Sequence, residues 1–311
     1  MRVLVTGGCG YIGSVLVPKL LAAGYDVVVM DIQWFGDHLG THPRLRVTDI
    51  DIRKPFPLEH YDAIIHLAAV ANDPTGDLDP QLTWELNALA TMRLADGAAR
   101  SGVKQFIYAS SGSVYGVSDA PQVTEETPLD PISEYNKTKM VAERCVLSYS
   151  DKMAVQILRP ATVCGYSPRM RLDVVVNMLT MQAMTKGQIT VLGGSQMRPN
   201  IHIQDMTDLY LWMLERPQLT GIWNAGFENL SVAAIAEKVE SYVNCRIATC
   251  PSKDPRSYRM NSDKLLAAGF KPQNTVDDAI GDIVAQIATG ALRDEEKYYN
   301  LKAMPRCLQS A

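Results

Sequence analysis

Three side chains in the middle of the chain have the types and the spacing needed to move a proton. Tyr135 and Lys139 are four residues apart in the segment SEYNKTKMVAE, so in a helix they lie on one face. A Lys ammonium beside a phenol favours the phenolate and lowers the phenol pKa from about 10. Ser111, in the strand-like segment YASSGSVYG, can hydrogen-bond the same substrate oxygen. The three could take a proton from a hydroxyl group while the carbon that carries it releases a hydride.

The start of the chain indicates where that hydride would go. The segment MRVLVTGGCGYIG has a strand, then Gly7, Gly10 and Gly13, then a helix. Glycines there allow a tight turn and a close approach to a pyrophosphate, which the helix N-terminus attracts. Asp31 ends the next strand, near the ~20-residue offset at which an acid binds the ribose hydroxyls. A carboxylate there repels the additional phosphate of NADP, so NAD is the expected cofactor.

Each of these patterns has an ordinary alternative when it is taken alone. A glycine triplet can be a plain strand–turn–helix, Asp31 can cap a turn, and Tyr135 with Lys139 can be a surface pair. Their combination along one chain favours the functional interpretation.

Short β-branched runs alternate with helical patterns through the first half of the chain. We expect strands at 3–5, 27–30, 45–47, 63–66, 106–109 and 155–158, and helices at 12–23, 80–101 and 133–149. This alternation predicts an α/β fold, a Rossmann-type doubly wound parallel sheet with helices on both faces.

The pattern changes beyond about residue 165. Helices are expected at 173–185, 206–215, 232–243 and 276–288. We therefore expect an NAD-binding domain over 1–166, with its sheet completed by parts of 198–226. Residues 167–311 are expected to form mainly a smaller, mixed α/β domain for the substrate.

The composition indicates a folded protein and excludes several classes of partner. Of the 311 residues 47% are hydrophobic and 21% are charged, and the net charge is −4. A mildly acidic chain gives no reason to expect nucleic acid or an anionic membrane as a partner. Local groups must therefore hold any anionic ligand.

The cysteines and the hydropathy pattern predict a cytoplasmic protein. The cysteines are scattered without a C-x-x-C pair, which predicts reduced thiols and no metal site. We see no signal-peptide pattern and no apolar run near the ~20 residues that span a bilayer. The six are Cys9, Cys145, Cys164, Cys245, Cys250 and Cys307.

With these residues, the chain resembles the extended short-chain dehydrogenase/reductases. It is most similar to the NAD-dependent epimerase/dehydratase family, typified by UDP-glucose 4-epimerase, and the resemblance extends over nearly the whole chain. It implies that Tyr135 is the base and that Lys139 holds the nicotinamide ribose and tunes Tyr135. It also implies that Ser111, three residues before V-Y-G, completes the catalytic set.

The resemblance also implies residues that bind the cofactor and the substrate. TDIDIR looks like the family's adenine-contacting pair, HLAA looks like its cofactor loop, and RPNIHIQD and DPRSYR look like segments that bind a substrate diphosphate. The cofactor set is Gly7, Gly10, Tyr11, Ile12, Gly13, Asp31, Asp51, Ile52, Leu67, Ala68, Ala69, Asn87, Tyr135, Lys139 and Pro160. The substrate set is Ser113, Thr162, Asn177, Arg198 and Arg256. Each arginine alone could equally be a solvated surface charge.

The chain departs from the family's pattern at informative positions. Sugar-nucleotide 4,6-dehydratases have Glu, often Asp-Glu, before V-Y-G, where this chain has Gly112 and Ser113. Dehydration and uronic-sugar decarboxylation therefore lose their expected carboxyl group. Thr162 replaces an Asn that contacts substrate. The segment SPRMRLDVVVN resembles a less characterised branch of cell-surface sugar enzymes, some of which only oxidise at C4.

The expected function is an NAD-dependent nucleotide-sugar 4-epimerase that acts through a transient 4-keto sugar. The alternative is a nucleotide-sugar 4-dehydrogenase or 4-ketoreductase with net turnover of NAD(H). A 4,6-dehydratase and a non-catalytic NAD-binding regulatory protein are further alternatives. The nucleotide and the sugar are left open.

The helical segments 80–101 and 133–149 each carry two apolar faces, and the matching pair forms a dimer interface in relatives. We therefore expect a homodimer, although both faces could instead be buried within one subunit. Four aromatic residues could stack on a nucleobase, but core packing is the expected role of each. These are Trp34, Phe35, Trp84 and Trp223.

Overall fold

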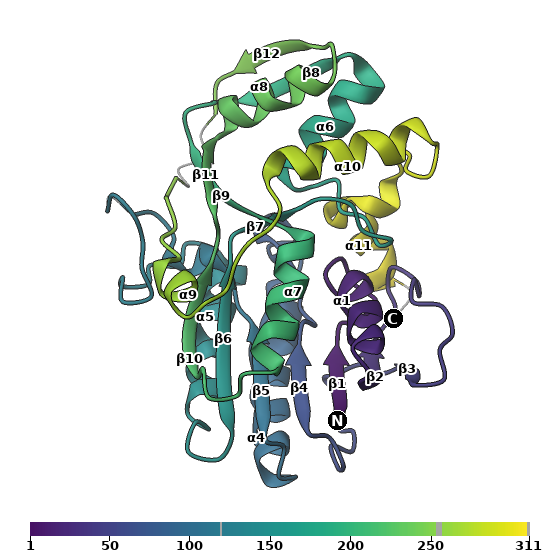
Figure 1. Cartoon of the computed structure of the whole chain (residues 1–311), viewed down its shortest axis with the longest axis vertical. Coiled ribbons are helices and arrows are strands. Elements are labelled where there is room, and N and C mark those ends of the chain that lie inside the picture. The colour runs from purple at the N-terminus through teal and green to yellow at the C-terminus, as the bar shows by residue number, and fades with distance from the viewer. Residues whose placement is uncertain (119, 253–256, 310–311) are drawn as a thin grey trace.

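A seven-stranded parallel sheet forms the body of the molecule, shown in a computed structural model (Figure 1). The model describes residues 1–118, 120–252 and 257–309, with side chains as far as 305 in the last range. The strand order is β10-β6-β5-β4-β1-β2-β3, which reverses direction between β1 and β4. The strands are β1 (Arg2–Thr6), β2 (Asp26–Asp31), β3 (Leu45–Asp49), β4 (Ala63–His66), β5 (Gln105–Ala109), β6 (Ala154–Pro160) and β10 (Gly221–Ala225). The predicted α/β fold class is confirmed.

Helices cover both faces of this sheet, which explains why its central strands are largely apolar and buried, whereas the edge strand β3 is partly exposed. Figure 1 shows α1 (Gly13–Ala22) and α7 (Ile203–Leu214) in front of the sheet, with α4 (Thr91–Arg100) and α5 (Glu134–Leu147) behind it. Successive strand residues point to opposite faces. Thus Val3 and Val5 pack in the cluster with α1 and α7, whereas Leu4 packs with α4 and α5.

The helix expected over 80–101 is divided into three parts. It consists of α3 (Pro80–Trp84), a π-helical turn η1 (Glu85–Ala90) and α4. The π turn brings the side chain of Asn87 to the backbone of Val70, where its amide accepts from the N–H at 2.8 Å and donates to the carbonyl at 3.0 Å. Two satisfied backbone groups account for this local change of helical pitch.

A smaller lobe packs above the carboxyl ends of the sheet strands (Figure 1). It contains α6 (Val175–Lys186), β8 (Gln188–Leu192), α8 (Val232–Tyr242), β12 (Arg246–Cys250) and α10 (Val276–Ala288), with a core of its own. A second sheet, β11-β9-β7, connects the two parts. Its strands are β7 (Thr162–Cys164), β9 (Met197–His202) and β11 (Glu228–Ser231).

Short elements complete the structure. They are α2 (Asp73–Gly76), η2 (Gly112–Tyr115), α9 (Asp263–Ala267), η3 (Glu296–Tyr298) and α11 (Asn300–Gln309). Among the described residues, every helix is too short or too polar to span a bilayer. The five cysteines whose side chains are described are all free thiols.

His66 ends β4 and is fully buried beneath the site described below. Its Nδ1 lies 2.6 Å from the hydroxyl of Thr6, and its Nε2 lies 2.7 Å from that of Thr91. Burial, aided by the nearby charge of Lys139, lowers the pKa of His66 to about 3. The folded protein therefore holds this ring in its neutral form.

We expect the free energy of unfolding to fall as the pH drops from 6.5 towards 3. In this window the unfolded chain binds a proton at His66 and the folded chain does not. The loss from this residue is about 2 kcal/mol at pH 5. Denaturant titrations between pH 8 and pH 5 measure it, with His66→Gln as the comparison. The variant is expected to start less stable but to lose less on acidification, and equal losses in the two proteins would contradict the assignment.

Candidate active site

A pocket opens at the carboxyl ends of β1, β2 and β4, beside the glycine-rich turn. Gly7 has φ +74°, and a Cβ there would lie 2.5 Å from the backbone nitrogen of Ala68. A Cβ at Gly13 would lie 2.5 Å from the Cα of Gly8. Any side chain at either position would push the turn away from its neighbours, so glycine is required. Eleven of the expected cofactor residues line this pocket: Gly7, Gly10, Tyr11, Ile12, Gly13, Asp31, Asp51, Ile52, Leu67, Ala68 and Ala69.

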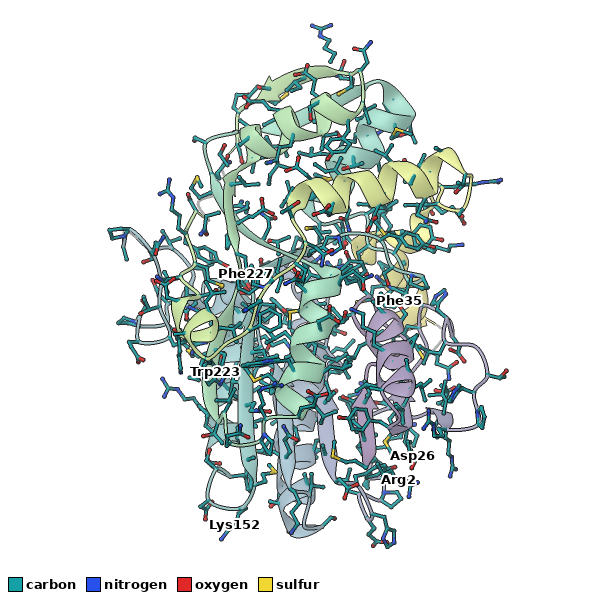
Figure 2. All side chains as sticks on the ribbon, viewed as in Figure 1. Arg2, Asp26, Phe35, Lys152, Trp223 and Phe227 are labelled. Carbon is teal, nitrogen blue, oxygen red and sulfur yellow. The ribbon has the colours of Figure 1, made fainter. Side chains whose placement is uncertain are left out.

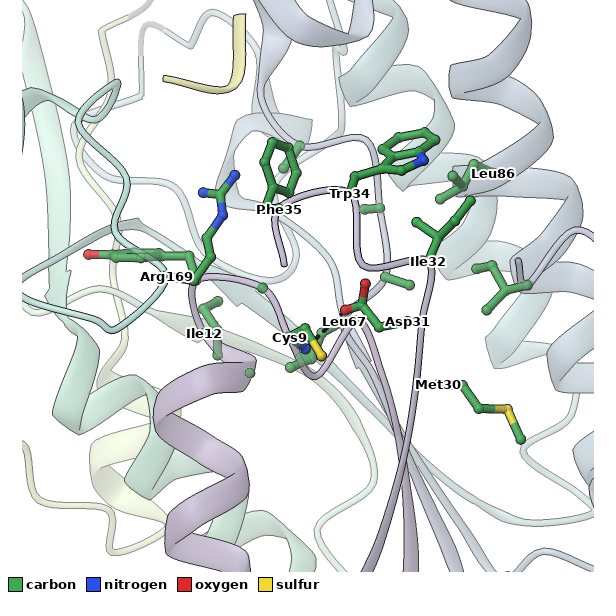
Figure 3. A pocket seen from close by; sticks show the side chains of 18 of the residues that line it. Cys9, Ile12, Met30, Asp31, Ile32, Trp34, Phe35, Leu67, Leu86 and Arg169 are labelled. Carbon is green, nitrogen blue, oxygen red and sulfur yellow. Dashed lines mark hydrogen bonds between the residues drawn. The ribbon is translucent and has the colours of Figure 1, made fainter. Parts of the chain in front are cut away.

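Asp31 is held at the pocket by backbone donors (Figure 3). Its carboxylate accepts from the N–H of Cys9 at 2.9 Å and from the N–H of Gln33 at 2.8 Å. Burial raises the pKa of Asp31, although these two bonds act in the opposite direction. Asp51 also lines the pocket, and Arg53 pairs with it at 2.7 Å. Partial burial would raise the pKa of Asp51, but the bonds and charge of Arg53 lower it.

Two of the four aromatic residues line the pocket, and one of them also packs in the core as expected. Trp34 and Phe35 follow β2 and line the pocket (Figure 3). Trp84 instead donates from its indole nitrogen to Glu134 at 2.7 Å. Trp223, labelled in Figure 2, is buried in β10 and donates to the carbonyl of Leu219. Trp34 and Phe35 can therefore contact a flat ring in the pocket, although Trp34 also packs against the cluster that contains Ile52, and Trp223 packs in the core.

The three proposed catalytic side chains meet where β5 ends and α5 begins. Ser111 caps η2, its hydroxyl lies 2.7 Å from that of Ser113, and it is close enough to Tyr135 to act on the pKa of that phenol. The Nζ of Lys139 donates to the carbonyl of Ala109 at 2.8 Å and lies 5.9 Å from the centre of the Tyr135 ring. Since Ala109 lines the pocket, this set adjoins the dinucleotide site.

Burial opposes the charge effect expected from the sequence. It raises the pKa of Tyr135 to about 12, although the hydrogen bond from Ser111 acts to lower it. It also lowers the pKa of Lys139 to about 7, against the attraction of Glu143. Lys139 is not among the groups that lower the pKa of Tyr135 here, and burial destabilises the ammonium itself. When bound, an oxidised nicotinamide supplies the positive charge and the hydride acceptor that this site requires.

Asn87 and Pro160, which were also expected to bind the cofactor, are not among the described residues that line the pocket. Asn87 is buried and its amide is bonded to Val70, so it supports the loop after β4. Pro160 ends β6, and its carbonyl oxygen would lie 3.1 Å from a Cβ placed on Gly112.

The expected substrate residues are dispersed, and Asn177 requires correction. Asn177 is fully buried, and its amide accepts from Gly165 and donates to the carbonyl of Arg171, so it shapes the protein instead of facing a substrate. Ser113 donates to Asn136 at 2.6 Å, beside the catalytic set. Thr162 begins β7. Arg198, on β9, is partly buried and donates to the carbonyl of Met197, while Arg256 lies outside the described residues.

Sequence reasoning missed the second half's contribution to the pocket. Arg169, Arg171 and Asn300 line it together with the glycine turn. The only sequence signal was the unusual segment SPRMRLDVVVN, which carries both arginines. The sequence around Asn300 did not predict its place in the pocket, because the residues it lies beside there are far away in the sequence.

The fold and the site define a class of protein. A glycine turn without room for Cβ atoms, an acid at the end of β2 and a Tyr–Lys–Ser set beside the pocket fit a dinucleotide and the chemistry of a short-chain dehydrogenase/reductase. Residues 3–226 match the model of the NAD dependent epimerase/dehydratase family. The chain belongs to this family, and it is an NAD-dependent enzyme.

Relatives extend over most of the chain. A UDP-glucose 4-epimerase of Lactobacillus helveticus is 28% identical and covers 90% of this chain and 95% of its own length. A UDP-glucuronic acid decarboxylase 1 of Arabidopsis thaliana is 30% identical over 95% of this chain and 72% of its own. The solved UDP-glucose 4-epimerase of Thermus thermophilus, in complex with NAD, has a TM-score of 0.83 and 25% identity, covering 94% and 100% of the two chains.

Asp31→Ser is expected to weaken the binding of NAD about tenfold or more, since a hydrogen bond to a charged group contributes about 1.5–3 kcal/mol. The same change removes the repulsion of a 2′-phosphate, so the preference for NAD over NADP falls further. Titration calorimetry with both dinucleotides measures this. Asp26→Ser, at the exposed far end of the same strand, is the control. Unchanged NAD affinity in Asp31→Ser would contradict the role given to this carboxylate.

Proposed function

We propose that this chain is a cytoplasmic, NAD-dependent 4-epimerase of a nucleotide sugar. The observation that carries the proposal is the gathering of Ser111, Tyr135 and Lys139 beside the dinucleotide pocket: Ser111 acts on the pKa of Tyr135, and Lys139 lies 5.9 Å from the Tyr135 ring centre and donates to the pocket residue Ala109. Such a set can remove and return a hydroxyl proton, as oxidation and re-reduction at one carbon require. The epimerases among the relatives support the choice of reaction.

In the proposed mechanism, Tyr135 would act as the phenolate, which the positive charge of an oxidised nicotinamide favours, and would take the proton of the C4 hydroxyl; bound NAD would supply the acceptor for the hydride of C4. Ser111 holds the C4 oxygen, and Lys139 fixes the cofactor ribose beside Tyr135. The 4-keto sugar then turns in the pocket. Tyr135 returns the proton as the hydride comes back to the opposite face of C4, so that NAD is unchanged after each cycle.

The absence of a carboxylate at 112 and 113 supports epimerisation over elimination or decarboxylation. A Cβ at Gly112 would overlap the terminal methyl of Met260 and would lie 2.9 Å from the hydroxyl of Tyr258. A side chain at this position would require Met260 and Tyr258 to move. At the next position, Ser113 is engaged with Asn136. Neither residue can therefore serve as a carboxylic acid/base.

The substrate diphosphate is the part of the ligand that we assign to arginine. Arg198 lies on β9, and the backbone N–H of Met197 beside it donates to the hydroxyl of Ser257 at 3.0 Å. Ser257 directly follows Arg256 in the sequence. We propose that these two arginines hold the diphosphate, for which guanidinium forks are suited.

The test is incubation of the purified protein with UDP-, GDP-, dTDP- and CDP-hexoses. Product NMR follows the configuration at C4, and absorbance follows NADH. The expected result is inversion at C4 with one nucleotide and without net NADH. Tyr135→Phe is expected to lower the turnover about 100-fold or more, with NAD binding retained. Accumulation of a keto sugar with NADH would instead establish the alternative 4-dehydrogenase.

We also propose that the protein is a homodimer. Leu89 and Met92 are 42% and 41% exposed on the outer face of η1 and α4, although both are large and apolar. The neighbouring helix α5 carries Met140 and Val141. A four-helix contact with a second copy would bury these side chains.

Light scattering is expected to give twice the mass of one chain. The double variant Leu89→Glu/Met92→Glu is expected to give the mass of a single chain, because the charges cannot be buried in the contact. A wild-type mass equal to one chain would overturn the dimer, and it would leave the proposed reaction untouched.

A further inference from the structure

The loop between β7 and α6 brings two arginines to the wall of the dinucleotide pocket. Arg169 and Arg171 line the same pocket as Gly10 and Tyr11 of the glycine turn, and Figure 3 shows Arg169 beside Phe35. The glycine turn offers backbone N–H groups and a helix N-terminus to a phosphate. The two arginines add fixed positive charge from a part of the chain more than 150 residues away.

The guanidinium of Arg171 is held at its Nε by a neighbouring carboxylate. Its Nε donates to the carboxylate of Asp173 at 2.9 Å, and its side chain is 14% exposed. The second oxygen of Asp173 accepts from Asn72 at 3.0 Å and from the N–H of Asn300 at 3.2 Å. Asp173 is therefore anchored to three segments and fixes the plane of the guanidinium.

One nitrogen of this guanidinium lacks a hydrogen-bond partner among the described residues. The Nη2 of Arg171 is shielded from solvent and has no hydrogen-bond partner among the residues the structure describes. A buried cationic donor without an acceptor is destabilising, and a phosphate oxygen would satisfy it. A planar guanidinium also matches the spacing of phosphate oxygens.

The charge of Arg171 also acts on the pKa values of two tyrosines that are expected to lie beside the bound cofactor. Burial dominates the pKa values of Tyr11 and Tyr135 and raises both, while the charge of Arg171 acts to lower each. Tyr11 belongs to the glycine turn and Tyr135 to the catalytic set. Arg171 therefore lies near the route from the pyrophosphate to the nicotinamide.

Arg169 has a different role, because it connects neighbouring segments of the pocket wall to one another. It is 2% exposed, its guanidinium carbon lies 3.8 Å from the centre of the Phe35 ring, and it donates to the Asn300 side chain at 2.5 Å. Met304, one turn further along α11, packs in a cluster with Ile52. These contacts attach α11 and the loop after β2 to the loop that carries Arg171.

We propose that Arg171 binds the diphosphate of NAD together with the glycine turn, and that Asp173 is its positioning residue. The dinucleotide is then gripped by both halves of the chain and must break a charge-assisted contact to leave. The substrate diphosphate is assigned elsewhere, to Arg198 and Arg256. The inference rests on the cofactor and not on the choice of sugar, but slow release of the dinucleotide is what the proposed epimerase needs between its two half-reactions.

Arg171→Gln and Arg171→Lys test this by titration calorimetry with NAD and, separately, with UDP, GDP, dTDP and CDP. Arg171→Gln is expected to weaken NAD binding about 10- to 100-fold and to leave nucleoside diphosphate binding unchanged. Arg171→Lys keeps the charge without the fork, so an intermediate loss is expected. Arg293→Gln, an exposed arginine outside the pocket, is the control. Circular dichroism shows that each variant is folded.

The outcomes separate this inference from the proposed reaction. Unchanged NAD affinity in folded Arg171→Gln, or a loss confined to the nucleoside diphosphate, would overturn the inference without affecting epimerisation. If Arg171→Gln does not fold, Arg171→Lys decides, because full NAD affinity without the fork counts against a bidentate contact. A wild type that binds NAD through Arg171 but inverts no sugar would retain the inference and remove the proposed function.

Discussion

The structure depends on a close backbone contact between the glycine turn and the loop after β4. At Gly7 there is no room for even one additional carbon beside Ala68, and at Gly13 the start of α1 lies equally close to the turn. These contacts set the depth of the pocket floor at the point where the strand order reverses. Asp31, Trp34 and the catalytic set are useful only because that floor lets a dinucleotide lie flat across the strand ends.

Around this floor, burial favours the uncharged forms of three side chains. Burial shifts Tyr135 towards the phenol and Lys139 towards the free amine, and it keeps the ring of His66 neutral. Burial therefore works against a phenolate at Tyr135 and an ammonium at Lys139. Bound ligands complete its electrostatics, so that the base becomes effective mainly when cofactor and substrate are both in place.

Local patterns made the sheet predictable, and contiguous motifs made half of the pocket predictable. Alternating strands and helices need only nearby residues, and the glycine turn with Asp31 lies within one β-α-β unit. The rest depends on contacts across the chain. Arg171 meets the glycine turn through a loop whose path the sequence does not specify, and Asn177 turned inward because backbone groups of that loop needed partners. The π turn at Asn87 likewise follows from a tertiary contact with Val70.

The position of α11 has a consequence for how the protein is made. Asn300 and Met304 close a pocket whose floor is encoded in the first residues, so a growing chain builds the glycine turn long before it can build the opposite wall. Until α11 docks, the apolar side chains of Ile52 and Leu86 that Met304 covers face water. A nascent chain with a finished first sheet therefore presents an open, apolar groove during synthesis, and secure retention of the dinucleotide is among the last properties that the folding protein acquires.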